Sequence, residues 1–235
     1  MLPPVSYDVF QLHNAIKGLG TRESTLIDIL CTRSADELQQ IKEEYMATFK
    51  SPLEHDINKD TSGDFRELLL SILRADREQV SPVDQKRAKE DAKKMAGRYK
   101  EKVKPSKRTF AAVFGKCNYA QAECTFAEYQ RLSGNIIQKG IKSNFDGDAR
   151  EAYMQLYAAM RDLTNYYATQ LYESMKGLGT RDIDLIRIIV SRSERDLEAI
   201  REEYKRTYQV SLAKAIQADC SGPYRDALIA IVEGN

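Results

Sequence analysis

The sequence predicts an all-α protein built from repeated groups of helices, and three observations support this prediction. Apolar residues recur three and four positions apart along most of the chain, as on one face of an amphipathic helix. No stretch of useful length alternates between apolar and polar residues, as a half-exposed β-strand would. The hexapeptide Lys-Gly-Leu-Gly-Thr-Arg occupies residues 17–22 and again residues 176–181, which indicates an internal repeat.

The repeat extends well beyond the hexapeptide, without a gap and at a constant offset of 159 residues. The matched positions are Arg33-Ser34 with Arg192-Ser193, Glu43-Glu44-Tyr45 with Glu202-Glu203-Tyr204, Asp60 with Asp219, and Ser62-Gly63 with Ser221-Gly222. A shift of 84 residues reveals a more diverged third copy between the two, in which Tyr129, Ile141 and Gly147 match Tyr45, Ile57 and Gly63. We therefore expect three repeats of five helices, at residues 1–80, 81–160 and 161–235.

The first repeat is expected to contain helices at 7–16, 24–30, 34–49, 52–60 and 65–73. The first of them ends at the glycines of the hexapeptide. Ser34 is a candidate N-cap, and Glu37 stands three residues later as its capping-box partner. Ser51-Pro52 is expected to cap the fourth helix, because proline is favoured at the first helical position. The cluster Asp60-Thr61-Ser62-Gly63 favours a turn after it.

The other two repeats show the same pattern. The middle repeat predicts helices at 88–96, 110–114, 120–132, 136–141 and 148–160, and the last repeat is helical from about 165 to 232. Residues 76–83, which include Ser81-Pro82, are the expected linker between the first and second repeats.

Composition excludes several classes of function. The chain has 36 Lys and Arg against 35 Asp and Glu, so no global charge attracts it to nucleic acid. No apolar run reaches the roughly 20 residues that cross a bilayer, and the first residues do not resemble a signal peptide, so we expect a cytoplasmic protein. The two histidines, His13 and His55, lie in no recognisable nucleophile motif, and no phosphate-binding loop is present. We therefore expect no enzyme activity.

Two interpretations of Lys-Gly-Leu-Gly-Thr compete. Glycine commonly ends a helix in the left-handed conformation, so each loop can be a simple helix C-cap. Each loop is also followed, 42 residues after its first glycine, by an aspartate in a second turn, Asp60 or Asp219. Glycines let carbonyl oxygens turn outward, and oxygen ligands with one carboxylate suit Ca²⁺ better than Mg²⁺. Such a site is weak by itself, and an acidic phospholipid could complete it.

The combination of Lys-Gly-Leu-Gly-Thr, an Arg-Ser about a dozen residues later and Asp-x-Ser-Gly, in repeats of roughly 70–80 residues, resembles the annexin family. The resemblance covers essentially the whole chain. It implies a curved disc that binds anionic, phosphatidylserine-like membranes through Ca²⁺ at loops on its convex face, peripherally and only when calcium is present. The implied calcium ligands are Ile16, Gly18, Gly20 and Asp60 in the first repeat, and Met175, Gly177, Gly179 and Asp219 in the last.

The resemblance also implies two further sets of residues. Minor calcium sites would fall on Thr21 with Glu23, and on Thr180 with Asp182. Ion pairs lining a central channel would join Asp8 to Arg33 and Asp28 to Arg187. For these four residues the alternative is structural, because an arginine can simply anchor a helix start and buried pairs often serve the register of packing.

Two departures from the family pattern bear on function. The middle repeat lacks both glycines and the acid, and carries a basic segment instead, in which Lys102, Lys104 and Lys107 are candidates for calcium-independent contact with anionic headgroups. The alternative is a solvated basic loop. The three repeats resemble the second, third and fourth of the usual four, so we also expect a missing first repeat or self-association through the surface it would cover.

A second function is compatible with the same predicted helices. The protein can be a structural or cytoskeletal scaffold that binds partners without calcium, with the loops as relics. Amphipathic helices do not discriminate between the two functions, because both require them.

Overall fold

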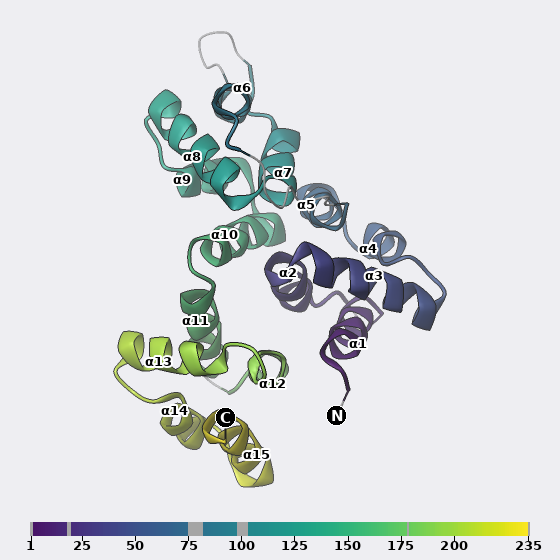
Figure 1. Ribbon diagram of the computed structural model, residues 1–235, viewed down its shortest axis with the longest axis vertical. Coiled ribbons are helices and arrows are strands. Elements are labelled where there is room, and N and C mark those ends of the chain that lie inside the picture. Colours follow the sequence, from purple (N-terminus) through teal and green to yellow (C-terminus); the bar gives the residue numbers. More distant parts are fainter. Residues whose placement is uncertain (1, 18–19, 75–81, 98–102, 178, 235) are drawn as a thin grey trace. The chain divides into compact units, whose positions relative to one another are not determined.

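The computed structural model describes residues 2–17, 20–74, 82–97, 103–177 and 179–234, and these residues form fifteen α-helices and no β-strand (Figure 1). This arrangement confirms the predicted all-α fold. Among the same residues, no helix combines the length and the apolar character that a membrane span needs. The chain divides into two compact units, Met1–Tyr157 and Ala158–Asn235. The finer division into repeats at 1–80, 81–160 and 161–235 stays a prediction.

The first unit begins with a group of five helices that match the predicted ones within a few residues. They are α1 (Pro4–Ile16), α2 (Glu23–Thr32), α3 (Ala35–Phe49), α4 (Leu53–Asp60) and α5 (Gly63–Leu73). Helix α1 starts earlier than the apolar pattern indicated, because Pro4 at its first position presets the helical φ angle. The core of the group contains Val9, Leu12, Leu26, Ile41 and Leu68, all with no exposed surface.

Local capping explains where α3 begins. The backbone N–H of Glu37 donates to Ser34 Oγ at 3.2 Å, and the backbone N–H of Ser34 donates to Glu37 Oε2 at 2.8 Å. This is the predicted capping box. The expectation for α4 was wrong in detail. Pro52 precedes that helix without a side-chain cap, and the Ser51 hydroxyl donates to Asp56 Oδ1 at 2.9 Å instead.

A second group of five helices follows in the chain. It comprises α6 (Gln85–Ala96), α7 (Lys107–Lys116), α8 (Tyr119–Ser133), α9 (Ile137–Asn144) and α10 (Gly147–Arg161). Helix α7 is longer than predicted, because the Ser106 side chain accepts from the backbone N–H of Thr109 and starts the helix there. Helix α6 packs against α8, and α5 packs against α7 (Figure 1), where the buried Ser71 hydroxyl donates to the carbonyl of Ala111 at 2.8 Å.

The second unit contains α11 (Leu163–Met175), α12 (Asp182–Arg192), α13 (Leu197–Tyr208), α14 (Leu212–Asp219) and α15 (Gly222–Glu233). Its core includes Tyr167, Leu171, Ile188, Ile189 and Ile200, all with no exposed surface. Helix α13 starts later than the match with α3 indicates. Asp196 stands where α3 has Glu37, and it accepts from Arg192 Nε at 2.6 Å instead of capping the helix.

A basic side chain donates a hydrogen bond to the C-terminal end of α5 in the first group, and another does the same at α15 in the second unit. Lys42 Nζ, on α3, donates to the carbonyl of Leu73 at 3.2 Å. A guanidinium nitrogen of Arg201, on α13, donates to the carbonyl of Val232 at 2.7 Å. Both interactions satisfy a carbonyl at a helix C-terminus, where a positive charge also suits the helix dipole. These two pairs lie at the repeat offset, so the duplication preserves the packing of the third helix on the fifth.

Candidate calcium-binding loops

The loop between α1 and α2 lies beside the end of α4. Thr21 Oγ1 donates to Asp60 Oδ2 at 2.8 Å, although the two residues are 39 positions apart. The backbone N–H of Arg22 donates to the carbonyl of Ala15 at 3.0 Å and closes the loop. The structure therefore brings the predicted carboxylate to the predicted loop and fixes one of its oxygens.

The loop between α11 and α12 repeats this geometry. Thr180 Oγ1 donates to Asp219 Oδ2 at 2.6 Å. The backbone N–H of Arg181 donates to the carbonyl of Ser174 at 2.7 Å. All four residues are the counterparts of those in the first loop at the offset of 159. Two segments in separate compact units thus adopt one arrangement, which a helix C-cap alone would not require.

Glycine is needed in both loops for the backbone conformation. Gly20 has φ of +83°, and Gly177 and Gly179 have φ of +110° and +85°, values that L-residues with a Cβ rarely adopt. A Cβ placed on any of the three would meet no atom within 4 Å, so the loops are open on that side. Gly18, the remaining predicted glycine ligand, lies outside the described residues.

The donor set suits a hard cation. Ile16 and Met175 are the last residues of α1 and α11, so their carbonyls lie beyond the intrahelical hydrogen bonds. Together with loop carbonyls and one carboxylate, they offer oxygen ligands of the kind that Ca²⁺ takes. No cluster of three or more His, Cys, Asp or Glu side chains suited to a metal occurs among the described residues.

The predicted minor sites are placed at the starts of helices. Glu23 is the first residue of α2 and Asp182 the first of α12, directly after Thr21-Arg22 and Thr180-Arg181. Both threonine hydroxyls already donate to the main-site carboxylates. Burial raises the pKa of Tyr224 well above its usual range, and the carboxylate of Asp182 adds to that increase. Asp182 is itself exposed, whereas Glu23 is partly buried.

Asp8 and Arg33, which both lie in the first unit, form the ion pair predicted between them. Arg33 donates from Nε and from a terminal guanidinium nitrogen to the two carboxylate oxygens of Asp8, at 2.6 and 2.8 Å. Asp28 is buried in the first unit. Arg187, in the second unit, is also buried and donates to Asp184 Oδ1 at 2.8 Å. Sequence comparison did not suggest Asp184 as a partner.

The middle repeat does not reproduce the site. Asn144, which replaces the acid, donates from its amide to the carbonyl of Gly140 at 2.8 Å. Lys107 is engaged within the first unit, with Nζ 2.6 Å from Asp64 Oδ2 and 5.4 Å from the centre of the Phe145 ring. Lys104 is exposed, and Lys102 lies outside the described residues. Among the described residues, Lys104 thus remains a candidate for lipid contact because its side chain is exposed. Lys107 instead contacts Asp64 and Phe145.

A polar network next to the first loop was missed by the sequence analysis. Asp56 is 4% exposed and accepts from Tyr45 Oη and Ser51 Oγ, each at 2.9 Å. Lys17 Nζ lies 3.4 Å from Asp56 Oδ2. Burial opposes the charge on Asp56, but the hydrogen bonds from Ser51 and Tyr45 and the charge of Lys17 outweigh it and lower the pKa of Asp56. The signal in the sequence was an aspartate on the apolar face of α4, next to Ile57.

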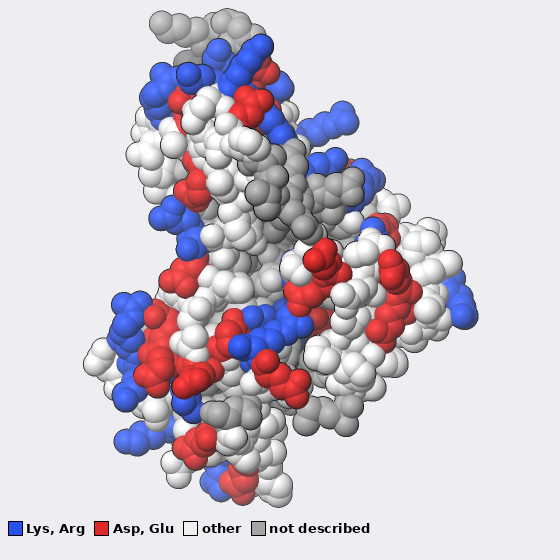
Figure 2. Space-filling view, in the orientation of Figure 1, with Lys and Arg blue, Asp and Glu red and all other residues white. Residues whose placement is uncertain are grey.

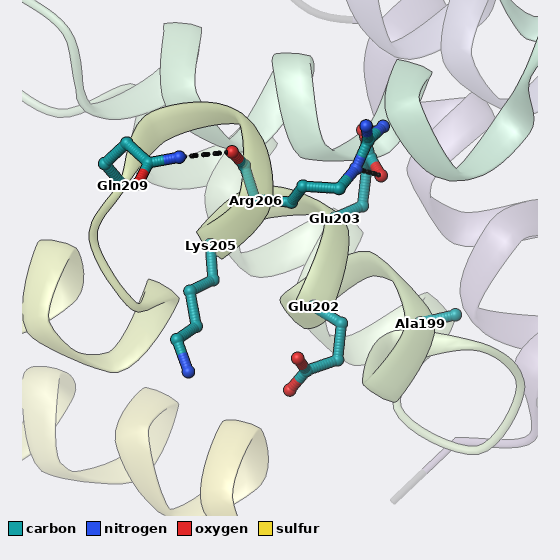
Figure 3. A pocket seen from close by; sticks show the side chains of 6 residues that line it. All are labelled: Ala199, Glu202, Glu203, Lys205, Arg206 and Gln209. Carbon is teal, nitrogen blue, oxygen red and sulfur yellow. Dashed lines mark hydrogen bonds and ion pairs between the residues drawn. The ribbon is translucent and has the colours of Figure 1, made fainter.

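A hollow on the surface of the second unit has a different character. It lies along α13 and is lined by Ala199, Glu202, Glu203, Lys205, Arg206 and Gln209 (Figure 3). Glu203 and the largely exposed Arg206 form an ion pair across one helical turn, at 2.6 Å. All the lining side chains come from one helix or its C-terminal residue, and none is a predicted calcium ligand. The hollow is therefore a charged helix face and not a candidate site.

Comparison with known proteins agrees with these features. A family model described as Annexin matches residues 7–72 and 166–231. Annexin A13 of Mus musculus is 40% identical over 229 residues, which cover 97% of this chain and 72% of that protein. Annexin B10 of Drosophila melanogaster is 38% identical over 234 residues, which cover 99% of this chain and 73% of that protein.

Solved structures give the same result. The structure of annexin III has a TM-score of 0.91 and 35% sequence identity, and the match covers 100% of this chain and 73% of that one. Calcium-bound annexin (Sm)1 has a TM-score of 0.82 and 28% identity, with coverage of 99% of this chain and 70% of that one. The two segments that match the family model each contain one of the loops with its threonine and aspartate.

Proposed function

Because the chain belongs to the annexin family, whose members bind phospholipids in a calcium-dependent manner, we propose that it binds anionic phospholipid membranes through Ca²⁺ at two loops. The first site comprises the carbonyls of Ile16, Gly18 and Gly20 with the carboxylate of Asp60. The second comprises Met175, Gly177, Gly179 and Asp219 in the same roles. The middle repeat lacks the two glycines and the aspartate of these sites, so we propose no such site there.

The observation that carries this proposal is the repeated threonine–aspartate contact. Thr21 and Thr180 each fix one carboxylate oxygen of the aspartate that follows 39 residues later. A fixed carboxylate costs less entropy to bind a cation than a mobile one. Two simple helix C-caps would need glycine, but they would not need an aspartate held against the loop in both copies.

The chain's own residues explain why lipid is needed. Each site supplies one full negative charge, and sites of low charge bind Ca²⁺ weakly, with Kd on the order of 10⁻⁴–10⁻³ M. When bound, Ca²⁺ supplies positive charge that an acidic phosphate can share. Because the two binding equilibria are linked, lipid tightens calcium binding by the same factor by which calcium tightens lipid binding. The near-neutral net charge of +1 fits this function, since the attraction to an anionic surface is provided by the metal.

Sedimentation with phosphatidylserine vesicles tests the proposal against the scaffold alternative. Wild type should sediment with vesicles when Ca²⁺ is raised and return to the supernatant in chelator. The double variant Asp60→Ala/Asp219→Ala should lose this response and keep its helical circular dichroism. Vesicle binding that ignores both the metal and the two substitutions would favour a calcium-independent scaffold.

A second, calcium-independent contact with the membrane is proposed for the middle repeat. Lys86, Lys89 and Lys93 follow one another at three- and four-residue spacing and form an exposed stripe on α6. Figure 2 shows Lys and Arg side chains gathered over this helix. The backbone N–H of Ser106 donates to the carbonyl of Lys94 at 2.8 Å, which places the segment of Lys104 at the end of the stripe. Each such cation contributes about 1 kcal/mol near an anionic surface.

This contact has its own test, in chelator and at low ionic strength. Lys89→Glu/Lys104→Glu should reduce residual binding to phosphatidylserine vesicles. Lys205→Glu/Lys214→Glu, on exposed helix faces of the second unit, is the control for a general charge effect. Equal loss in both variants would attribute residual binding to net charge and contradict a contact at α6.

A further inference from the structure

The first loop is tied to the protein interior by the side chain of Lys17. This residue directly follows the last residue of α1, so it opens the loop. Its Nζ lies 3.4 Å from Asp56 Oδ2, while the side chain itself is 46% exposed and that of Asp56 only 5%. The ion pair thus links the start of the loop to a buried carboxylate on α4.

The position of that carboxylate is fixed from several sides. Tyr45, which has no exposed surface, and Ser51 each donate to one oxygen of Asp56. Tyr45 Oη also lies 3.4 Å from Nδ1 of His13, which belongs to α1 and precedes Lys17 by one helical turn. The His13 ring stacks on Phe49 with centroids 3.6 Å apart and an interplanar angle of 6°. The acceptor for Lys17 is therefore held by α3 and α4 independently of the loop.

The last repeat preserves the aromatic part of this network and lacks its acid. At the offset of 159, His13 and Phe49 become Tyr172 and Tyr208, which stack with centroids 4.0 Å apart. Asp56 becomes Ala215, and Ser51 becomes Val210.

The lysine of the second loop consequently has other partners. Lys176 Nζ lies 3.3 Å from Glu173 Oε1, one turn back on its own helix, and both side chains are about half exposed. The same nitrogen lies 5.5 Å from the centre of the Tyr172 ring. Neither partner links the loop to α14, the helix that supplies Asp219.

From this difference we propose that Asp56 is a positioning residue for calcium binding at the first loop, acting through Lys17, and that the second loop has no equivalent. The inference rests on the proposed function. Helix α4 carries both Asp56 and Asp60, so the ion pair and the threonine contact join that helix to the two ends of the loop. Lys17 and Thr21, at the two ends of the loop, are thereby held in place before calcium arrives, which improves binding by lowering its entropic cost.

The sign of one substitution separates positioning from simple electrostatics. If Lys17 acted only as a nearby positive charge, Lys17→Met would remove repulsion and strengthen binding of Ca²⁺. If Lys17 positions the loop, the same substitution weakens binding. Asp56→Asn weakens binding under both interpretations, so Lys17→Met is the informative variant.

The experiment measures the calcium concentration for half-maximal sedimentation with phosphatidylserine/phosphatidylcholine vesicles. In an Asp219→Ala background, which isolates the first loop, Lys17→Met should raise this midpoint roughly two- to fivefold, as expected for a partly exposed ion pair. Lys17→Arg should restore it, because a guanidinium also pairs with Asp56. In an Asp60→Ala background, which isolates the second loop, Lys17→Met should change nothing.

Thermal unfolding accompanies each titration, so that a loss of fold is not mistaken for a loss of site geometry. A midpoint that stays the same or falls in Asp219→Ala/Lys17→Met overturns the positioning role and leaves the proposed function intact. An Asp219→Ala parent that no longer responds to calcium overturns the two-site function itself, and the positioning role with it.

Discussion

Arg33 donates two hydrogen bonds, of 2.6 and 2.8 Å, to the carboxylate of Asp8 inside the first unit. Both residues are 2% exposed. At the repeat offset Asp8 becomes Tyr167, and Arg192 lies over that ring, 4.7 Å from its centre, while pairing with Asp196. One arginine position thus has a carboxylate partner in one copy and an aromatic partner in the other.

This pair predicts a large, asymmetric effect on stability. Asp8→Ala leaves the guanidinium of Arg33 buried without that carboxylate and should lower the free energy of unfolding by about 3–5 kcal/mol. Arg192→Met should cost less, because the side chain of Asp196 is 28% exposed and can be hydrated when the arginine is removed. Urea denaturation followed by circular dichroism measures both. Equal losses would show that burial of the partner does not set the cost.

The threonine hydroxyls should matter for calcium more than for folding. Thr21→Val and Thr180→Val remove the donor that fixes Asp60 or Asp219, so the calcium midpoint for vesicle binding should rise about tenfold, a usual effect of losing a residue that orients a ligand. Thr→Ser at either position retains the hydroxyl and should remain near wild type. A Thr→Val variant with an unchanged midpoint would mean that the aspartate needs no such support.

Glycine in the loops gives a matched comparison with a glycine elsewhere. Gly20→Ala forces a Cβ into a left-handed conformation and should cost about 1 kcal/mol of stability, although the space around it is open. Gly134→Ala, at the C-cap of α8, has φ of +71° and equally open space, so it should cost a similar amount. Only Gly20→Ala should also weaken calcium-dependent sedimentation. A calcium effect in both would indicate a global cause.

Because of His13, we expect the protein to lose stability in mild acid. Burial lowers the pKa of His13, and the charge of Lys17 lowers it further, below the ordinary value of 6.5. The unfolded chain therefore binds the proton more tightly than the native protein, and the free energy of unfolding falls as pH drops below about 6.5 toward the native pKa. His13→Tyr, which copies Tyr172 of the last repeat, should flatten that decline in urea titrations at pH 7.5 and pH 5.5. His55→Gln serves as the control, and an unchanged slope in His13→Tyr would assign the decline to other groups.

Several features followed from the sequence because they depend on short-range chemistry. Helix positions came from apolar spacing, the capping box of α3 from Ser34 and Glu37, and the duplication from identity at one fixed offset. The location of the candidate loops also followed, since a glycine-shaped turn and a carboxylate are visible as residue types. Resemblance to a family then joined each loop to an aspartate 39 residues after its threonine.

Only the tertiary structure determined which polar side chains meet. The hydroxyl of Thr21 on Asp60, the network of Tyr45 and Ser51 around Asp56, and the tie from Lys17 to Asp56 all join residues on different helices or loops. The same holds for Arg192, the repeat counterpart of Arg33, which lies over the ring of Tyr167 and pairs with Asp196. The physical reason is that apolar periodicity specifies which face of a helix is buried. The partner of a buried charge depends on the distance and direction between helices, which only packing fixes.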